Sequence, residues 1–474
     1  MKTKLGNSII AVVLAVMVAF AAGCSDDDDG SIVNPPIPGE TPAVSNLAYG
    51  ATSVYATLDN GAMLRAVHAS PDAPAVDIYV KGSEGSYTID LRGAGASSSS
   101  APVFSVDVTI PADAKVTALA AGLLTSSNDN DKFRLIPLAE DFGTPGANEA
   151  IVRIVHASPD APTVDIDVND DATVDVPNLA RFADTGASGV ALPAGTPIQV
   201  AIWAGGSRVT AFTTPNLPEG AELFVIASGL LSKQPRDTDG FTLLAVAPTG
   251  SVGFVKQNPV VFALHASPDA PNVDIYAGST RLVEDLPFAD LSGAIQVPPG
   301  SYDLGFRETG TGSNAAVLTT PELAAGERYL AIASGFLSST PDFRLLPYGD
   351  GFGESMTQAL VRVVHASPDA PAVDIGTESN GTVTPVPDFT NLGFEAASTG
   401  TGTALPVGTL PIGIAGTGST DAVATFTVPT SAGLKAFAVA VGAFTPEGSE
   451  KTFRLVIVDA TDFPWQSLEI APNE

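Results

Sequence analysis

Short runs of apolar or alternating residues follow one another along most of the chain, and Gly, Pro, Asp or Asn residues separate them. Alternation with a period of two is typical of strands that bury one face, and short apolar runs are typical of fully buried strands. No window shows a capped helical stripe of ten or more residues. The pattern therefore predicts an all-β protein.

The stretch 253–353 shows the predicted elements best. We expect eight strands there, at Val260–His265, Val273–Tyr276, Thr280–Leu286, Ala294–Val297, Tyr302–Arg307, Ala315–Thr319, Tyr329–Ser334 and Phe343–Pro347. Seven or eight short strands in about 100 residues are typical of an antiparallel, immunoglobulin-like β-sandwich. A propeller with two blades per stretch is the alternative, and it is disfavoured because the two halves of the stretch do not resemble each other.

One heptapeptide, HASPDAP, occurs four times, and its histidines are the four histidines of the chain. The copies begin at His68, His156, His265 and His365, which are 88, 109 and 100 residues apart. An apolar run precedes each copy, and Val-Asp-Ile follows after one variable residue. A small-residue strand (ALAAGLL, VIASGLL, AIASGFL, AVAVGAF) and a closing strand that begins with Phe133, Phe241, Phe343 or Phe453 share the period. Such periodicity is the signature of tandem repeats.

These observations predict four tandem antiparallel β-sandwich domains, each able to fold alone. The expected divisions are a signal peptide at 1–23, a flexible acidic and Pro-rich tether with Cys24 at 24–60, and repeats at 61–147, 148–252, 253–353 and 354–474, the last with a C-terminal tail.

The side chains of HASPDAP and Val-Asp-Ile are the candidate site residues. Two prolines force the chain into a turn after the histidine, so the His and both Asp side chains are expected to face one another across it. We favour a structural role, in which imidazole and carboxylates bond each other and the turn backbone. A weak metal site is the alternative, and a Ser70–His68–Asp72 nucleophile is disfavoured because the spacing is too short. The candidates are His68, Asp72, Asp77, His156, Asp160, Asp165, His265, Asp269, Asp274, His365, Asp369 and Asp374.

The N-terminus carries the signals of export. Lys2 and Lys4 precede an apolar segment at 9–20, which is too short for a comfortable membrane span, and Ala21-Ala22-Gly23-Cys24 follows. Cysteine after Ala-Gly resembles the bacterial lipobox, which implies an acylated Cys24 and a lipid anchor in the membrane. Ser25, rather than Asp, follows the cysteine, which resembles the pattern of outer-membrane lipoproteins. We expect a cell-envelope location, on the periplasmic or the surface face.

Charge and cysteine content narrow the function. The formal net charge of -30 disfavours nucleic acid as a partner. Cys24 is the single cysteine, so disulfides cannot stabilise the fold. No cofactor motif is present: the Ser127–Asp131 stretch lacks the glycine and terminal glutamate of a calcium loop, and no P-loop lysine follows a glycine pair.

The sequence pattern resembles the domain of unknown function 4397, because a strand leads into HASPDAPxVDI and a P-x-G turn follows. The resemblance covers residues about 61 to 460. The resemblance implies an exported or surface-attached protein of tandem domains with no agreed catalytic role. Tyr79 and Tyr276 match the aromatic position after Val-Asp-Ile, whereas Asp167 and Gly376 depart from it.

Two functions follow as expectations. The first is an envelope lipoprotein with a structural, adhesive or ligand-binding role and no catalysis, whose partners are envelope proteins or polysaccharide. The second is a cation-binding (Ca²⁺ or another divalent metal) or metal-dependent hydrolytic envelope protein that uses the His and Asp side chains of HASPDAP.

Overall fold

The computed structural model describes residues 42–473, without the side chains of Ser251 and Val252. The predicted signal peptide, Cys24 and the first part of the predicted tether lie outside these residues. The described chain consists of β-strands and one short 3-10 helix, η1, so the prediction of an all-β protein is confirmed. Within residues 42–473, no helix is long and apolar enough to cross a membrane.

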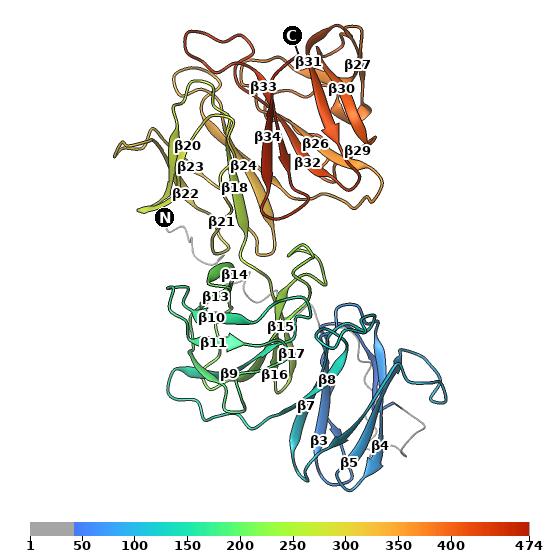
Figure 1. The fold of residues 1–474 in the computed structure, drawn as a ribbon. Coiled ribbons are helices and arrows are strands. Elements are labelled where there is room, and N and C mark those ends of the chain that lie inside the picture. Colours follow the sequence, from blue (N-terminus) through green and yellow to red (C-terminus); the bar gives the residue numbers. More distant parts are fainter. Residues whose placement is uncertain (1–41, 474) are drawn as a thin grey trace, which may run out of the picture.

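The strands group into the four predicted repeats (Figure 1). Repeat 1 contains β1 (Val44–Leu47), β2 (Ala56–Thr57), β3 (Met63–His68), β4 (Val76–Ser83), β5 (Ser86–Gly93), β6 (Phe104–Thr109), β7 (Lys115–Ala121) and β8 (Arg134–Ala139). Repeat 2 contains β9 (Glu149–His156), β10 (Val164–Val168), β11 (Val176–Leu179), β12 (Val190–Pro193), β13 (Gln199–Ala204), β14 (Ser207–Thr213), β15 (Glu222–Ser228), β16 (Thr242–Ala247) and β17 (Gly250–Val255).

The second half of the chain follows the same order. Repeat 3 contains β18 (Val260–His265), β19 (Val273–Ala277), β20 (Thr280–Leu286), β21 (Ile295–Gln296), β22 (Asp303–Glu308), β23 (Ala316–Thr319), β24 (Arg328–Ser334) and β25 (Arg344–Gly349). Repeat 4 contains β26 (Ala359–His365), β27 (Val373–Ser379), β28 (Thr382–Pro385), η1 (Pro387–Phe389), β29 (Thr403–Leu405), β30 (Gly408–Gly416), β31 (Ala422–Thr430), β32 (Lys435–Val441), β33 (Arg454–Asp459) and β34 (Gln466–Ile470).

Each repeat is a sandwich of two sheets. We call the sheet that contains the strand before HASPDAP the motif sheet, and the sheet that contains Val-Asp-Ile the outer sheet. The motif sheets have the orders β2-β3-β7-β8, β12-β9-β15-β16-β17, β21-β18-β24-β25 and β29-β26-β32-β33-β34. The outer sheets have the orders β1-β4-β5-β6, β11-β10-β13-β14, β20-β19-β22-β23 and β28-β27-β30-β31. The predicted tandem sandwiches are thus confirmed.

One feature of every motif sheet differs from the antiparallel expectation. The strand before HASPDAP pairs in parallel with the small-residue strand, as β3 with β7, β9 with β15, β18 with β24 and β26 with β32. The chain leaves the motif sheet through the two-proline turn, passes through the outer sheet and returns in the same direction. A parallel pair requires such a long crossover, which strand patterns alone do not reveal.

Repeat 1 begins earlier than predicted. β1 pairs with β4 in the place that β11, β20 and β28 occupy in the other repeats, and β2 pairs with β3 in the place of β12, β21 and β29. Repeat 1 therefore has a rearranged strand order: its two equivalent strands precede the HASPDAP strand instead of following the Val-Asp-Ile strand. Residues 44–57 belong to the sandwich, which corrects the predicted tether at 24–60. The shift also explains why the first two motif copies are only 88 residues apart.

Repeats 2 and 4 each carry a fifth strand in the motif sheet. β17 pairs with β16, and β34 pairs with β33, so the expected C-terminal tail of repeat 4 is partly a strand. In repeats 1 and 3 the corresponding edge strands, β8 and β25, carry Pro137 and Pro347, which have no N–H to offer to a further strand. The equivalent positions in repeats 2 and 4 are Ala245 and Ile457, and both pair onward.

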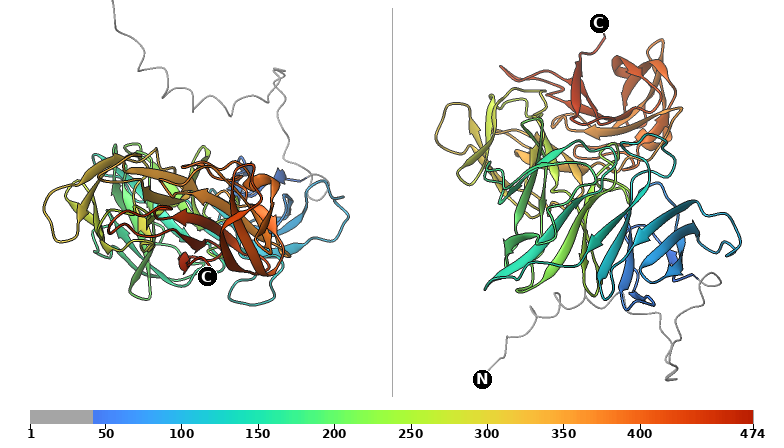
Figure 2. Two further views of the ribbon diagram at one scale, coloured as in Figure 1. Left: turned by 90° about the horizontal axis from the view of Figure 1, so that it is seen from above. Right: turned by 60° about the horizontal axis from the view of Figure 1, so that its bottom comes forward.

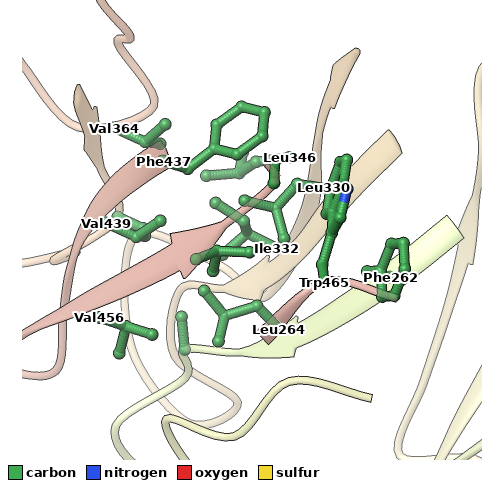
Figure 3. Packing of buried hydrophobic residues seen from close by; sticks show 14 of the residues in the cluster. Phe262, Leu264, Leu330, Ile332, Leu346, Val364, Phe437, Val439, Val456 and Trp465 are labelled. Atoms are coloured by element: carbon green, nitrogen blue, oxygen red, sulfur yellow. The ribbon is translucent and has the colours of Figure 1, made fainter. Parts of the chain in front are cut away.

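The motif sheets pack face to face within two pairs of repeats, 1 with 2 and 3 with 4. One apolar cluster combines Val67, Leu119 and Leu138 of repeat 1 with Val155, Phe224, Ile226 and Leu244 of repeat 2. A second cluster combines Phe262, Leu264, Leu330 and Ile332 of repeat 3 with Val364, Phe437, Val439 and Trp465 of repeat 4 (Figure 3). Repeats 1 and 2 therefore form one double sandwich, unit 1, and repeats 3 and 4 form another, unit 2, as the further views also show (Figure 2).

This pairing changes the expectation that each repeat folds alone. A motif sheet is buried on both faces, by its own outer sheet and by the neighbouring repeat, so all six residues of β18 are buried. A single repeat would expose one of these faces to water. The pair of repeats is the smallest part of the chain in which the motif sheets are covered.

Candidate functional site

The strand before HASPDAP divides its side chains between two cores. In repeat 1, Leu64 and Ala66 face the outer sheet, whereas Val67 and Ala69 face repeat 2. Alternation places His68 inside its own sandwich and the Ala of HASPDAP in the face between repeats. The same division holds for Ala157, Ala266 and Ala366, which belong to the clusters between repeats.

Each motif histidine is buried and bonds the turn that follows it. The imidazole Nε2 lies near the carbonyl oxygen of the second motif proline, at 3.1 Å for His68–Pro74, 2.8 Å for His156–Pro162, 3.0 Å for His265–Pro271 and 3.1 Å for His365–Pro371. A carbonyl only accepts hydrogen bonds, so Nε2 carries the proton. Burial lowers the pKa of all four imidazoles and keeps them neutral.

The histidines do not bond the carboxylates, which corrects the expectation that the His and Asp side chains face one another. The turn carries the two groups to different partners, because the prolines direct the carbonyl of the turn back to the imidazole. The aspartates of the turn instead cross to the loop after the small-residue strand.

The first aspartate of the motif caps that loop. Asp72 accepts hydrogen bonds from the N–H groups of Leu124 and Thr125, at 2.7 and 2.9 Å. Burial alone would raise the pKa of Asp72, but the bonds from Thr125 and Leu124 outweigh it and lower that pKa. The same two backbone bonds recur from Leu231 and Ser232 to Asp160, from Leu337 and Ser338 to Asp269, and from Phe444 and Thr445 to Asp369.

The motif serine ties the turn to the same strand end. Its buried hydroxyl donates to the carbonyl of the glycine that ends the small-residue strand, at 2.6 Å for Ser70–Gly122, 2.7 Å for Ser158–Gly229, 2.7 Å for Ser267–Gly335 and 2.6 Å for Ser367–Gly442. All four serines are fully buried. The hydroxyl is thus a structural donor, far from the exposed geometry that a nucleophile needs.

The aspartate of Val-Asp-Ile bonds a left-handed residue in the segment that lies beside its strand. Asp77 accepts from the N–H of Asn46 at 2.7 Å, and Asp165, Asp274 and Asp374 accept from Asn178, Asp285 and Asn391 at 2.7, 2.8 and 2.7 Å. Those four donors have φ between 50° and 55°, a region that Asn and Asp tolerate better than most residues.

This contact reveals a motif that our sequence reasoning missed. Asn or Asp is followed by Leu and, after one or two residues, by an aromatic residue: Asn46-Leu47 with Tyr49, Asn178-Leu179 with Phe182, Asp285-Leu286 with Phe288 and Asn391-Leu392 with Phe394. Tyr49, Phe288 and Phe394 lie edge-on to the motif imidazole of their repeat, with ring centroids 6.2, 6.0 and 6.5 Å apart. The motif precedes HASPDAP only in repeat 1, so it could also have revealed the rearranged strand order of that repeat.

Contacts between repeats are reciprocal. The third residue of the apolar run before HASPDAP reaches the end of the closing strand of the partner repeat: Arg65 Nη1 donates to Ala247 O at 2.6 Å, Arg153 Nη1 to Ala139 O at 2.8 Å, and Arg362 Nη1 to Gly349 O at 3.0 Å. Repeat 3 has Phe262 there, stacked on Trp465 with centroids 4.5 Å apart. Equivalent surfaces thus meet in each unit, as in a two-fold symmetric dimer.

The described motif side chains bond the backbone and neighbouring side chains of their own repeat. Among the described residues there is no group of three or more His, Cys, Asp or Glu side chains placed to hold a metal ion. The motif carboxylates accept N–H bonds, so a cation would have to displace these donors. The sandwich interiors of repeats 2, 3 and 4 contain apolar cavities of about 60, 40 and 90 Å³, whereas a metabolite pocket has a volume of roughly 300 Å³ or more.

Comparison with known protein families agrees with the repeat structure. The family described as "Domain of unknown function (DUF4397)" matches residues 79–167 and 260–376. Each match runs from one repeat into its partner, from β4 to β10 and from β18 to β27. Among solved structures, the Bacillus anthracis TIE protein is similar over 78% of this chain and 71% of that chain, with 10% sequence identity and a TM-score of 0.15, which supports no argument. The comparison with curated proteins gave no match.

Proposed function

The chain contains tandem domains of the DUF4397 family, and from this premise we propose that it is a lipid-anchored envelope protein with a structural or adhesive role and no catalysis. One observation carries the proposal: all four copies of HASPDAP use the same side chains for the same internal hydrogen bonds. A catalytic site has little reason to recur in every domain, whereas every domain has to fold.

Modular architecture supports an adhesive role. Two double sandwiches in one chain present related surfaces twice, and linked modules bind more tightly through effective concentration than either does alone. The proposed partners are proteins or polysaccharide of the envelope, since the charge of -30 repels nucleic acid. The test compares the affinity of the purified mature chain for envelope extracts with the affinity of each unit alone. Equal affinity of a single unit would contradict binding through avidity.

The proposed anchor is the acylated Cys24, in an outer-membrane or surface-facing lipoprotein. Because β1 begins at Val44, the segment between anchor and first strand is 19 residues long.

We expect Cys24→Ser to abolish lipidation and to give a soluble or an unprocessed protein, because the acyl chains on Cys24 are the anchor once the signal peptide has been cleaved. Fractionation of cells that produce either form, after a high-salt wash, measures the effect, and Ser25→Ala is the matched control. If the Cys24→Ser protein stays with the membranes in processed form, lipid anchoring is refuted.

A further inference from the structure

The contact between units 1 and 2 has a different chemistry from the contacts inside them. Within the described chain, no apolar cluster combines residues before Lys256 with residues after Pro259. Polar side chains cross this boundary instead. Each unit is therefore closed by an apolar core, while the orientation of one unit on the other depends on a few polar contacts.

The chain crosses the boundary within a few residues. The N–H of Asn258 bonds Ala211 of repeat 2, whereas the carbonyl of Gln257 and the N–H of Val260 bond Gly326 and Glu327 of repeat 3. Pro259 lies among these attachments and has no N–H of its own. The backbone around Pro259 is therefore the pivot between the units.

Side-chain contacts lie on both sides of this pivot. β18 starts directly after it, and β21 and β25 form the two edges of the same sheet. On the β21 edge, Gln296 bonds Arg208 and Thr210 of repeat 2, both at 3.1 Å. At the end of β25, the loop after Gly229 in repeat 2 brings Arg236 to Asp350 and Phe352. Arg236 Nη2 donates to the Phe352 carbonyl at 2.8 Å, and Nη1 lies 3.2 Å from Asp350 Oδ1.

Neighbouring positive charges, rather than hydrogen bonds, stabilise the Asp350 carboxylate. Its side chain is 1% exposed, and neither carboxylate oxygen has a hydrogen-bond partner, nor does the buried Nε of Arg328 beside it. Lys435 of repeat 4 adds a further positive charge, and it also pairs with Glu354 at 2.6 Å. A buried carboxylate without hydrogen bonds is costly to maintain, so Asp350 depends on the positive charges beside it, and one of them comes from the other unit.

The equivalent position in unit 1 is different. Glu140 aligns with Asp350, because the N–H of each bonds the residue that opens the small-residue strand, Lys115 or Arg328. Glu140 lies 3.0 Å from Arg65 of its own repeat and accepts hydrogen bonds from Tyr55 and Thr117. The Glu140 carboxylate thus finds all these partners inside unit 1, whereas the Asp350 carboxylate of unit 2 pairs with Arg236 of the other unit.

We propose that Arg236 and Asp350 form a latch, which holds the two double sandwiches in one orientation and releases them to turn about Pro259. Opening requires no change inside either apolar core. In a tethered protein, such a joint varies the direction in which the far unit points while both units stay folded.

Distances between spin labels test the latch in the mature chain without Cys24, with the exposed Ser99 and Ser449 replaced by cysteine. The wild-type pair is expected to give one narrow distance distribution. Arg236→Gln is expected to add a second population at a different distance. Asp350→Asn is expected to do the same, and the double variant to add no more than either single change, because both act through one contact.

Two controls separate the latch from general loosening. Arg281→Gln breaks an exposed ion pair with Glu284 inside repeat 3 and is expected to leave the distribution unchanged. A second label pair, Ser313 and Ser449, lies within unit 2 and is expected to stay narrow in every variant. An identical distribution for wild type and Arg236→Gln overturns the proposal, and so does a wild type that is already broad. Broadening of the pair within unit 2 also overturns it, because the contact would then hold unit 2 together.

Discussion

At the scale of single residues, HASPDAP distributes its side chains among separate tasks. The imidazole bonds the turn carbonyl inside the sandwich, the Ala packs against the neighbouring repeat, the Ser bonds the small-residue strand, and the Asp caps the loop beyond it. In repeat 3 these are His265, Ala266, Ser267 and Asp269. Each task has strict size and polarity requirements, which explains why the heptapeptide recurs unchanged.

His265→Ala is expected to destabilise unit 2. The change removes the hydrogen bond to the Pro271 carbonyl and leaves a cavity in place of the fully buried imidazole, and the lost hydrogen bond alone costs about 0.5–1.5 kcal/mol. Calorimetry of the full chain measures the effect, which should be a lower midpoint for one transition and no change in the other. Asp290→Ala serves as control, because Asp290 is exposed, lies outside the motif and contacts His265 through its backbone carbonyl, which the change keeps. An unchanged midpoint for unit 2 would mean that the imidazole contributes nothing to the fold.

Stability is also expected to fall as the pH is lowered below about 6.5. The pKa of each motif histidine is lowered in the folded state because of burial, so the unfolded chain binds more protons there. The contribution of the histidines is complete above the unfolded pKa of about 6.5 and is lost as the pH falls towards the folded pKa. The motif aspartates Asp72, Asp269 and Asp369 have lowered pKa values too, but their contribution is lost only below about 3.8.

Unit 1 should show this dependence most clearly. Burial raises the pKa of Asp350 and of Glu327 in unit 2, and these groups oppose the trend because their protonation favours the folded state. Thermal melts between pH 7.5 and 5.0 are the measurement, with His68→Gln as the comparison. A midpoint for unit 1 that does not change over this range would contradict neutral, buried histidines.

At the scale of elements, glycines and prolines decide where the strands end and pair. Gly335 ends β24 with φ of +89°, and a Cβ there would lie 2.3 Å from the carbonyl oxygen of Asp342. Gly122, Gly229 and Gly442 meet the same obstacle at 2.3, 2.3 and 2.4 Å. The two closing loops approach so closely that only glycine fits, and the motif serine bonds the carbonyl of this same residue.

Gly335→Ala is therefore expected to destabilise unit 2 more than a glycine change that meets only backbone strain. Gly278 is the matched control, since it has φ of +58° and nothing within 4 Å of a Cβ. A left-handed alanine costs about 1–2 kcal/mol, and the steric overlap should add about 1–3 kcal/mol at Gly335. Denaturant unfolding of both variants gives the comparison. Equal losses of unfolding free energy in the Gly335 and Gly278 variants would mean that the closing loops can move apart without a loss of stability.

The strand pattern was readable from the sequence, and the partners of the strands were not. In repeat 3, β18 and β20 have the predicted bounds, and the other six strands lie within two residues of theirs. The run Val260–His265 indicates burial on both faces, but apolarity does not say which surface covers the second face. β1 was missed because residues 44–47 lie in a Pro-rich stretch without a strong pattern. The motif residues were found, while the bonding of His to Pro rather than to Asp depends on turn geometry that spacing does not determine.

At the scale of the whole molecule, pairing has produced two interfaces of unlike chemistry. In unit 1, Arg65 bonds the Ala247 carbonyl of the partner repeat, whereas in unit 2 Phe262 at the equivalent position stacks on Trp465. A mispaired repeat 1 and repeat 4 would bury Arg65 against Trp465 and would leave Phe262 uncovered. The interfaces therefore favour pairing between neighbours in the sequence, which matters in a chain with four related sheets.

The pair of repeats, rather than the single repeat, is expected to be the folding unit. A fragment of residues 258–473 should be monomeric and should melt as cooperatively as unit 2 in the full chain. Residues 258–353 alone would expose Phe262, Leu264, Leu330 and Ile332, each worth about 1.5–3 kcal/mol when buried. Their sum approaches the whole stability of a domain, about 5–15 kcal/mol, so the single repeat should be unfolded or should dimerise through this face. Sedimentation and circular dichroism of both fragments decide the matter. A single repeat that is monomeric and as stable as the pair would show that the shared core adds nothing, and the units would then be only neighbours.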